Sequence, residues 1–520
     1  MLQTAKIFQD HMVLQRELPI TVWGQTDAGA LVKAELSGAK GTASAVSEPA
    51  GEDGAWRLTL PPQEAAENVT LTLLTEQEQL TFSDVAIGEV WLAGGQSNME
   101  FCMRYEKHKT EALRDCENSR VRFFDVPEVC FDGQLEAFDY SRMAVWRKAD
   151  EENLEYFSAV GYYFEKDLEK ELDVPVGIIG CNWGGTTASA WMDKKTVEKV
   201  GPDWIKEFEK NTAKLDMEQY WKDQLTNPAN NRGNLFDEFS EMVMPKTPSG
   251  EELMQFFQKA MEQAKAAGFD NLQDAMGQMV QPQTVPGCLY EHMVKTIAPY
   301  TVRGALWYQG ESDDDVPGLN VLYKDMLTAL IGDWRKLWGQ DFPFLIVQLP
   351  GFETWMMQPP HNHYQVIRQC QEEVTKTVKD TWLCSISDVG EQFDIHPKDK
   401  RTVGQRLALL ARKHIYGEDI LADAPEAEEI RREGRQIAIT FSNAGAGLSI
   451  AGDELAAMQV FAGEKEVALD ACTEKDQLLL TLAEDVDGPF TVAFAKTMWY
   501  QVNLYNEAGI PAIPFAFDCE

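Results

Sequence analysis

Short runs of alternating apolar and polar residues fill the first 86 positions of the chain. "ITVWGQ" at residues 20–25 and "AWRLTL" at residues 55–60 have this two-residue period, and Gly, Pro and Asp separate the runs. Such a period is typical of strands with one buried face, and no helical period lies between the runs. The pattern predicts that residues 1–86 form an N-terminal β-sandwich-like module.

From residue 87 the apolar runs become continuous, as in "GEVWLAGG", "VPVGIIGCNW" and "VRGALWYQG". Long amphipathic stretches lie between them, and residues 321–338 carry apolar side chains at helical spacing. Continuous apolar strands that alternate with helices are typical of a parallel sheet covered on both faces. We therefore expect an α/β domain over residues 87–418.

Two further segments depart from this alternation of apolar strands and helices. Residues 203–285 are rich in Glu, Lys, Met and Gln and include the helical stretch "EELMQFFQKAMEQAKAAG". We interpret them as a helical insertion in the α/β domain. The two-residue period returns after the domain, for example in "RQIAITFSN", and predicts a C-terminal β-module over residues 419–520.

Charge and composition exclude several classes of protein. The 520 residues include 84 Asp and Glu against 47 Lys and Arg, a formal net charge of −37. This charge repels phosphate backbones and anionic lipids, so we expect neither nucleic acid nor membrane as a partner. The start lacks a hydrophobic signal region, and nine scattered cysteines form no CxxC pair. We expect a cytoplasmic protein with reduced thiols and no metal site. The pattern predicts no particular oligomeric state.

Polar residues follow four of the predicted core strands directly. Because carboxyl ends of parallel strands meet at one edge of a sheet, these residues should share a crevice. A hydroxyl, an imidazole, a carboxylate and oxyanion donors are the set that nucleophilic acyl transfer needs. The four groups are Gln96-Ser97-Asn98, Gly184-Gly185, Gln309 with Glu311, and Asp394 with His396.

Each of these groups also has a purely structural explanation. Gly184-Gly185 can form a simple turn, Gln309 and Glu311 can cap a helix, and His396 can be a surface or capping residue. The turn at Ser97 reads G-G-Q-S-N, so the GxSxG signature of α/β-hydrolases is absent. The residues alone leave catalytic and structural explanations open.

Four stretches resemble the signature stretches of the sialate O-acetylesterase family, a group of SGNH (GDSL-like) hydrolases. They are "WLAGGQSNME", "NWGGTTASAW", "WYQGESD" and "DIHPKDKRTVGQRLA". The start "IFQDHMVLQRELPITVWG" and the end "VNLYNEAGIPAIPF" are also similar to that family, so the resemblance spans nearly the whole chain. It implies a three-layer SGNH core and carbohydrate O-deacetylation without a cofactor.

The resemblance also implies roles for individual residues. Ser97 would be the nucleophile, His396 the general base, and Asp394 the group that orients the imidazole. The oxyanion donors would be the backbone N–H of Ser97, a backbone N–H in Gly184-Gly185, and the Gln309 side chain. Gln96, Asn98 and Glu311 are expected to support the Ser97 turn or line the substrate pocket.

Two departures from the family pattern leave alternatives open. Asp394 lies two residues before His396, where related hydrolases often have a spacing of three. Asp388 or Glu391 could then orient the imidazole, or Ser97 and His396 could act nearly as a dyad. The stretch "CLYEHMVKTIAP" differs from the family near Glu291, so His292 is expected to line the substrate pocket.

These inferences predict an O-acetylesterase that hydrolyses acetyl esters on sugar hydroxyls through an acyl-enzyme. An O-acetylated sugar or oligosaccharide, above all an acetylated sialic acid, is the expected partner. The alternative within enzymes is an acetyl-xylan or other plant-glycan esterase. The alternative from another class is a non-catalytic glycan-binding protein.

Overall fold

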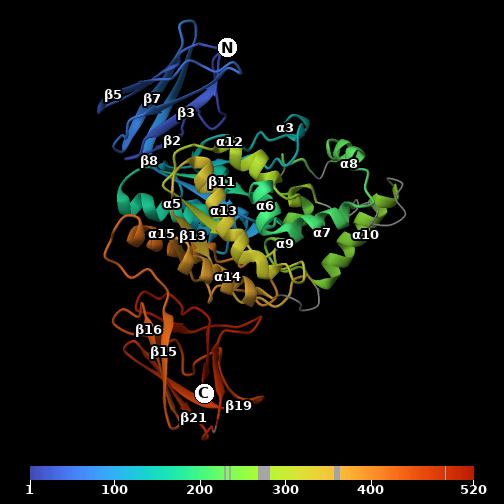
Figure 1. The fold of residues 1–520 in the computed structure, drawn as a ribbon, viewed down its shortest axis with the longest axis vertical. Helices are drawn as coiled ribbons and strands as arrows, with labels where there is room; N and C mark the ends of the chain where they lie inside the picture. The colour runs from blue at the N-terminus through green and yellow to red at the C-terminus, as the bar shows by residue number, and fades with distance from the viewer. Residues whose placement is uncertain (228–229, 234–235, 267–280, 357–362, 487, 520) are drawn as a thin grey trace.

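A computed structural model describes residues 1–227, 230–233, 236–266, 281–356, 363–486 and 488–519. Figure 1 shows β-rich parts at the two ends of the molecule, with blue N-terminal strands at the top and red C-terminal strands at the bottom. Between them lies a part in which helices surround a sheet. Among the described residues, no helix has both the length and the apolarity that a bilayer crossing requires.

A sheet of 11 strands organises the described part of the chain. Its core runs in the order β10-β9-β11-β8-β12-β13-β14, and all neighbours from β9 to β14 are parallel. Only β10, at the edge of this path, pairs antiparallel. The predicted parallel arrangement is therefore found in the core, although the sheet as a whole is mixed. The strands are β8 (Gln79–Gly95), β9 (Asn118–Asp125), β10 (Arg147–Ala149), β11 (Val176–Asn182), β12 (Gly304–Tyr308), β13 (Phe344–Val347) and β14 (Thr381–Cys384).

Helices cover both faces of this core. Trp91 of β8 packs against Phe164 of α5 (Ala159–Leu172), and Trp307 of β12 packs against Trp334 of α13 (Tyr323–Trp338). Trp91 lies opposite Gly304, three residues before Trp307, so the two indoles point to opposite faces. Helix α15 (Lys400–His414) packs with α5, and α14 (Tyr364–Thr377) packs with α13.

Strand β8 belongs to two parts of the fold. Its first half pairs with β2 and β7 of the N-terminal module, and its second half is the central strand of the core. The boundary expected between residues 86 and 87 therefore lies inside one continuous strand. The module's strands are β1 (Gln3–Thr4), β2 (Val13–Gln15), β3 (Ile20–Gln25), β4 (Lys33–Gly38), β5 (Gly41–Val46), β6 (Ala55–Leu60) and β7 (Ala66–Leu74).

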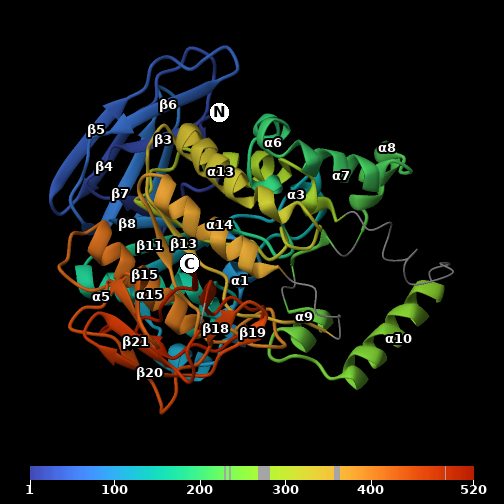
Figure 2. The same cartoon turned by 60° about the horizontal axis from the view of Figure 1, so that its bottom comes forward.

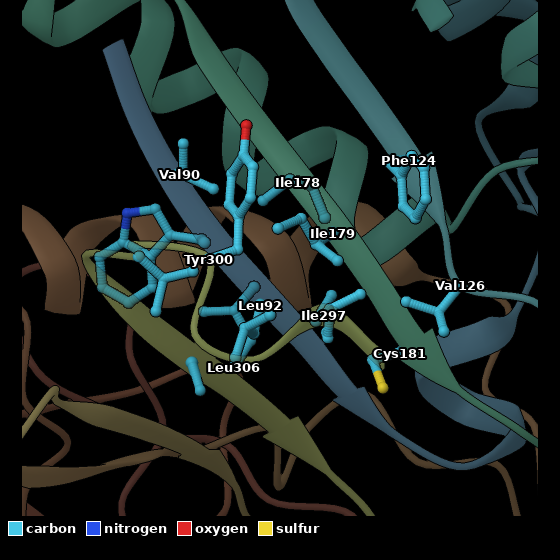
Figure 3. Packing of buried hydrophobic residues seen from close by; sticks show 14 of the residues in the cluster. Val90, Leu92, Phe124, Val126, Ile178, Ile179, Cys181, Ile297, Tyr300 and Leu306 are labelled. Carbon is cyan, nitrogen blue, oxygen red and sulfur yellow. The ribbon is translucent and has the colours of Figure 1, made fainter. Parts of the chain in front are cut away.

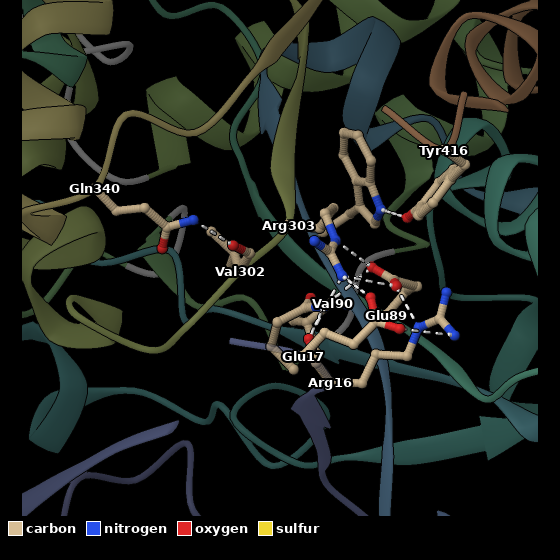
Figure 4. A network of polar contacts seen from close by, with 10 residues as sticks. Arg16, Glu17, Glu89, Val90, Val302, Arg303, Gln340 and Tyr416 are labelled. Atoms are coloured by element: carbon tan, nitrogen blue, oxygen red, sulfur yellow. Dashed lines mark hydrogen bonds and ion pairs between the residues drawn. The ribbon is translucent and has the colours of Figure 1, made fainter. Parts of the chain in front are cut away.

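A buried carboxylate joins the N-terminal module to the core at the start of the core half of β8. Glu89 has no exposed surface, and its oxygens lie 2.6 Å from Arg16 Nε and 2.8 Å from Arg303 Nε (Figure 4). Although burial alone would raise it, these guanidinium groups lower the pKa of Glu89. The charged network lies at the opposite end of the core half of β8 from Ser97.

Apolar side chains fill the space around the core sheet. Figure 3 shows Leu92, Ile179 and Leu306 from three neighbouring strands, with Ile297 and Tyr300 beside them. The hydroxyl of Tyr300 donates to the carbonyl of Val13 at 2.7 Å, so this buried ring also contacts the N-terminal module. The strands are buried on both faces, as their continuous apolar runs predict.

Helices of the insertion lie to one side of the sheet in both ribbon views (Figures 1 and 2). Residues 228–229, 234–235 and 267–280 of the predicted insertion lie outside the described residues. The insertion helices are α7 (Pro202–Thr212), α8 (Met217–Gln224), α9 (Glu238–Val243) and α10 (Gly250–Ala266). The other α-helices are α1 (Ser97–Glu100), α2 (Lys109–Arg114), α3 (Gln134–Ala137), α4 (Glu151–Leu154), α6 (Lys194–Val200) and α12 (Lys295–Ile297).

The C-terminal part of the chain forms separate small sheets around its own apolar cluster. Strands β15, β16, β21 and β20 make one sheet, β19, β18, β22 and β24 make another, and β17 pairs with β23. Their bounds are β15 (Glu426–Glu433), β16 (Gln436–Ser442), β17 (Ser449–Ile450), β18 (Met458–Ala462), β19 (Lys465–Glu466), β20 (Leu469–Glu474), β21 (Gln477–Leu482), β22 (Phe490–Phe494), β23 (Leu504–Tyr505) and β24 (Phe515–Cys519).

Candidate active site

Ser97 follows the end of β8 after a turn that only glycine permits. Gly95 has φ +140°, and a Cβ built on it would lie 2.0 Å from the carbonyl oxygen of Tyr308 on the neighbouring strand. Both the backbone angle and the close approach therefore exclude larger residues. The turn places Ser97 at the first position of α1, at the carboxyl edge of the core sheet.

His396 completes a hydrogen bond with Ser97 across the crevice. Its Nε2 lies 2.9 Å from the Ser97 Oγ. The His396 side chain is 6% exposed, and the ring of Trp355 meets it edge-on with centroids 5.1 Å apart. If Nε2 accepts the serine proton, the ring's own proton is on Nδ1. The geometry is that of a hydroxyl next to its general base.

The surroundings keep His396 uncharged. Burial, helped by the positive charges of Lys398 and Lys400, lowers the pKa of His396 well below 6.5. Lys400 is itself fully buried, and burial together with Lys398 lowers its pKa to about 7. A neutral imidazole is the form that can take a proton from Ser97.

Asp394 faces the same histidine but forms no hydrogen bond with its ring. Asp394 Oδ1 lies 3.8 Å from His396 Nδ1 and accepts the backbone N–H of His396 at 2.8 Å. Its Oδ2 accepts from the Thr247 hydroxyl at 3.1 Å and lies 2.9 Å from Lys398 Nζ. Nδ1 has no hydrogen-bond partner among the described residues. This arrangement is closer to the dyad alternative than to a hydrogen-bonded triad.

The two alternative carboxylates are occupied elsewhere. Asp388 forms a two-point ion pair with Arg406, with distances of 2.6 and 2.8 Å. Glu391 Oε1 accepts the backbone N–H of Lys398 at 2.9 Å. No contact within the described part of the chain joins either carboxylate to the His396 ring. Of the three candidate carboxylates, Asp394 is therefore the one that is placed to orient the His396 ring.

Asn98 connects the serine turn to the histidine loop. Its Nδ2 donates to Glu311 Oε1 at 2.6 Å and to the carbonyl of Ile395 at 2.9 Å, and its Oδ1 accepts from Lys400 Nζ. The pKa of Glu311 is raised above its ordinary value because burial outweighs the opposite effect of the bond from Asn98. Gln96 is buried too, and its Oε1 accepts the backbone N–H groups of Gly310 and Ser312, both at 3.3 Å. These side chains hold three strand-end loops together.

The glycine pair after β11 lies directly against Ser97. A Cβ on Gly184 would lie 3.1 Å from the Ser97 Cβ, which is tighter than ordinary contact. The N–H of Gly184 donates to Glu100 Oε2 at 2.6 Å, so it is occupied. No acceptor is found in the described residues for the N–H of Gly185. Ser97, as first residue of α1, has no partner for its N–H inside the helix.

Gln309 does not face this crevice. It has no exposed surface, and its Nε2 donates to Asp313 Oδ2 at 2.5 Å and to the carbonyl of Thr186 at 3.0 Å. Its Oε1 accepts from the Tyr323 hydroxyl at 2.9 Å. Both N–H groups of the amide are used inside the fold, and burial raises the pKa of Asp313 to about 7. The structure therefore does not bring Gln309 to the crevice, where the sequence predicts that it donates to an oxyanion.

His292 also lies away from Ser97. It is on the π-helical turn Tyr290–Val294, whose residues Tyr290, Met293 and Val294 point into the core. His292 therefore turns outward, into a different cavity that is also lined by Ile7 and Phe124. The structure therefore does not bring His292 to the Ser97 cavity, although the sequence predicts that it lines the substrate pocket.

A cavity of about 480 Å³ opens at the Ser97–His396 pair. It is lined by Ser97, His396, Gly184 and Gly185, and also by Arg232 and Trp355, which the sequence did not single out. This volume is within the range of about 300–1,000 Å³ found for small-molecule sites. The pair is therefore accessible to a ligand of moderate size.

Arg232 is half-buried and forms ion pairs at the wall of this cavity. Its Nη2 lies 3.0 Å from Glu100 Oε1, and its Nε pairs with Glu128. Although burial alone would lower it, these carboxylates raise the pKa of Arg232. The guanidinium is thus an internal counter-ion for two carboxylates. Arg232 occurs in "NNRGN", a stretch without periodicity, so only the fold reveals its position.

One group of side chains among the described residues has the spacing of metal ligands. Ligand atoms of Glu106, His108 and Asp399 all lie within 4.8 Å of one another. None of these three lines the Ser97 cavity. The Ser97 site itself contains a hydroxyl, an imidazole and backbone donors, which suit acyl transfer.

Comparison with known proteins points to carbohydrate esterases. Residues 253–413, which include His396 but not Ser97, match the family model described as carbohydrate esterase, sialic acid-specific acetylesterase. Sialate O-acetylesterase from Mus musculus is 27% identical over 447 residues, which cover 80% of this chain and 73% of the mouse protein. The Homo sapiens sialate O-acetylesterase is 25% identical over 459 residues, with coverage of 82% and 73%.

A solved structure resembles the chain over its full length. The crystal structure of a carbohydrate acetylesterase from Xanthomonas citri matches with a TM-score of 0.72 at 25% identity, and the match covers 100% of both chains. The family model, the mammalian relatives and this structure all point to one type of enzyme. The chain is thus an esterase, and it is similar to sialate O-acetylesterases over most of its length.

Proposed function

We propose that this esterase removes acetyl groups from sugar hydroxyls with Ser97 as nucleophile and His396 as general base. The observation that carries the proposal is the 2.9 Å contact between Ser97 Oγ and His396 Nε2 at the wall of an open cavity. A binding protein needs neither a neutral buried imidazole nor its contact with a serine hydroxyl. The non-catalytic alternative is therefore disfavoured.

The geometry suggests how the reaction would proceed. His396 Nε2 takes the proton of Ser97 as Oγ attacks the acetyl carbonyl carbon, and the carbonyl oxygen becomes an oxyanion. The sugar oxygen then leaves with the proton from His396, and Ser97 remains acetylated. Water, deprotonated by the same imidazole, attacks this ester, releases acetate and regenerates Ser97.

The oxyanion donors that we propose are the backbone N–H groups of Ser97 and Gly185. Both belong to residues that line the cavity, and the N–H of Gly184 is already bound to Glu100. Backbone donors fixed before the reaction stabilise charge that develops only in the transition state. Asp394, 3.8 Å from Nδ1, would stabilise the imidazolium through its charge.

We also propose that the core is of the SGNH type. Support comes from the order of the parts: Ser97 after β8, the glycine pair after β11, and His396 in the loop between β14 and α15. All three lie at carboxyl ends of parallel strands, where α/β sheets bind their ligands.

The charge of the cavity favours a neutral glycan over a sialic acid as substrate. Its described lining residues include three carboxylates and a single guanidinium, that of Arg232. Since Arg232 is paired with Glu100 and Glu128, a sugar carboxylate would meet net negative charge there. Acetylated xylan or a similar uncharged glycan is therefore the substrate class that the charges favour, whereas acetylated sialic acid is the class that the names of the relatives suggest.

Acetate release from defined substrates tests the function. The enzyme is incubated with p-nitrophenyl acetate, an O-acetylated sialic acid and acetylated xylo-oligosaccharides, and acetate is measured for each. We expect release from p-nitrophenyl acetate and at least one acetylated sugar. Binding of the sugars without acetate release from any of the three would support the glycan-binding alternative and contradict the proposal.

A further inference from the structure

A second cavity adjoins the Ser97 cavity. It has a volume of about 460 Å³, and both cavities are lined by Gly185, Gln281, Ser312 and Asp315. The shared residues include Gly185, whose N–H we place in the oxyanion hole. A ligand that occupied the Ser97 cavity could therefore extend past Gly185 into the second one.

Helix α7 of the insertion supplies the aromatic part of this second cavity. Trp204 and Phe208, four residues apart on the helix, both line it. Trp204 is buried and Phe208 half-buried, so the wall is fixed by packing while part of the Phe208 ring stays accessible. Aromatic rings are apolar surfaces that keep little conformational freedom, which suits the contact with the C–H face of a sugar ring.

Hydroxyl and amide groups form the polar part. Thr187 and Ser189 line the cavity with their hydroxyl oxygens 2.7 Å apart, and Asn211 lies one turn beyond Phe208 on α7. In such a pair one hydroxyl donates to the other, and the second keeps its own proton for a further partner. Aromatic rings beside neutral hydrogen-bonding groups match the alternating surfaces of a sugar.

The charges in this cavity have one sign. Glu207 and Asp315 line it, and no Lys or Arg is among the described residues that do so. The sequence places no Lys or Arg in residues 228–229, 234–235, 267–280 or 357–362 either. Neither cavity therefore has an unpaired cation that could bind a sugar carboxylate.

From these observations we propose that the second cavity binds the sugar ring next to the acetylated one. The substrate is then an acetylated oligosaccharide of uncharged sugars, held at two subsites, rather than a single acetylated sugar. This inference rests on the proposed function, because the first subsite is defined by the Ser97–His396 pair.

Substrates of increasing size test the second subsite. Phe208→Ala and Asn211→Ala are compared with wild type on p-nitrophenyl acetate, an acetylated xylose monosaccharide and an acetylated xylo-oligosaccharide. We expect Phe208→Ala to lower kcat/KM for the oligosaccharide by about tenfold, the size of one aromatic contact, and to leave the two small substrates unchanged. Asn211→Ala should act on the same substrate in the same direction.

The matched control is Ile205→Ala, on the same helix. Ile205 packs against the core and lines neither cavity, so its truncation reports on the folding of α7 alone. Its kcat/KM should stay at the wild-type value on all three substrates. Thermal unfolding of each variant shows that the compared proteins are folded.

Two outcomes would overturn the inference. One is an equal effect of Phe208→Ala on all three substrates, or no effect on the oligosaccharide. The other is a higher kcat/KM of the wild type for an acetylated sialic acid than for the acetylated xylo-oligosaccharide. Failure of the proposed function is distinct, since the wild type would then release no acetate from any of these substrates.

Discussion

The side-chain amide of Asn98 donates a hydrogen bond of 2.9 Å to the carbonyl of Ile395. Asn98 directly follows the proposed nucleophile, and Ile395 directly precedes the proposed base. The bond therefore fixes the distance between two loops that are almost 300 residues apart in the sequence. The second donor bond of the same amide, to Glu311, anchors both loops to the end of β12.

Replacing Asn98 with Ala should lower kcat by about 10²-fold, because a shift of the order of 1 Å between nucleophile and base has that effect. Asn506→Ala is the matched control. Asn506 is equally buried and donates to two carbonyls, those of Asp423 and Asn443, but it lies in the C-terminal part. Both variants should lose thermal stability, and only Asn98→Ala should lose kcat per folded molecule. Equal kcat in the two variants would contradict the role of Asn98.

The acid side of the pH profile should report the lowered pKa of His396. Since burial and two lysines hold this pKa below 6.5, kcat/KM should stay high at mildly acidic pH and fall only below pH 6.5. Lys398→Gln removes one of the positive charges and the partner of Asp394. Both effects favour the imidazolium, so the acid limb should move to higher pH.

Lys107→Gln is the control for this shift. Lys107 is 59% exposed and pairs with Asp399, and its charge does not contribute to the shift of His396. Its profile of kcat/KM between about pH 4 and 9 should match the wild type. An acid limb of Lys398→Gln at the wild-type position, or at lower pH, would contradict the electrostatic account.

Gln309→Ala should lower the stability of the protein more than its activity. The substitution removes the donors to Asp313 and Thr186 and the acceptor for Tyr323, so buried polar groups lose their partners. We expect a loss of about 1–3 kcal/mol in the free energy of unfolding, with kcat of the folded protein within about tenfold of wild type. A 10²- to 10³-fold lower kcat at an unchanged Tm is the result expected of an oxyanion donor, and it would restore that role.

Gly184→Ala should lower the activity of the enzyme. The added methyl group would lie 3.1 Å from the Ser97 Cβ and 3.2 Å from Glu100 Oε2, so Ser97 must move. We expect kcat to fall by tenfold or more, roughly, since the nucleophile leaves its productive position. Gly332→Ala, in the interior of α13 with open space around the new methyl, should keep kcat and raise Tm slightly. Wild-type kcat in Gly184→Ala would contradict the proposed geometry.

Strands that are buried on both faces could be predicted well from the sequence. The continuous apolar runs that end at Gly95, Asn182 and Tyr308 all form core strands. Strand β9 escapes this pattern because Arg120 and Arg122 interrupt its apolar residues. Arg122 is nevertheless 1% exposed, since its guanidinium donates to the carbonyls of Ser119, His11 and Asp84. Pairing with residues that are distant in sequence cannot be predicted from the residues around Arg122.

In the candidate site, too, partners that are distant in sequence could not be predicted. Ser97 and His396 could be predicted because strand ends and motif order place them at one edge. The direction of a side chain depends on partners distant in sequence: Gln309 turns inward to Asp313 and Thr186, and His292 turns outward. Motif position alone does not contain that information. Arg232 lines the cavity and forms ion pairs with Glu100 and Glu128, which are distant in sequence.

The most direct test of the account is acetylation of Ser97 itself. Wild type, Ser97→Ala and the control Ser37→Ala, an exposed serine of the N-terminal module, are mixed with p-nitrophenyl acetate. Each is measured for turnover and, after rapid acid quenching, for peptide mass. The account predicts an acetyl group on the peptide that contains Ser97 in wild type and Ser37→Ala, and turnover at least about 10³-fold lower in Ser97→Ala. Wild-type turnover by Ser97→Ala, or an acetyl group that forms on a different residue during turnover, would contradict it.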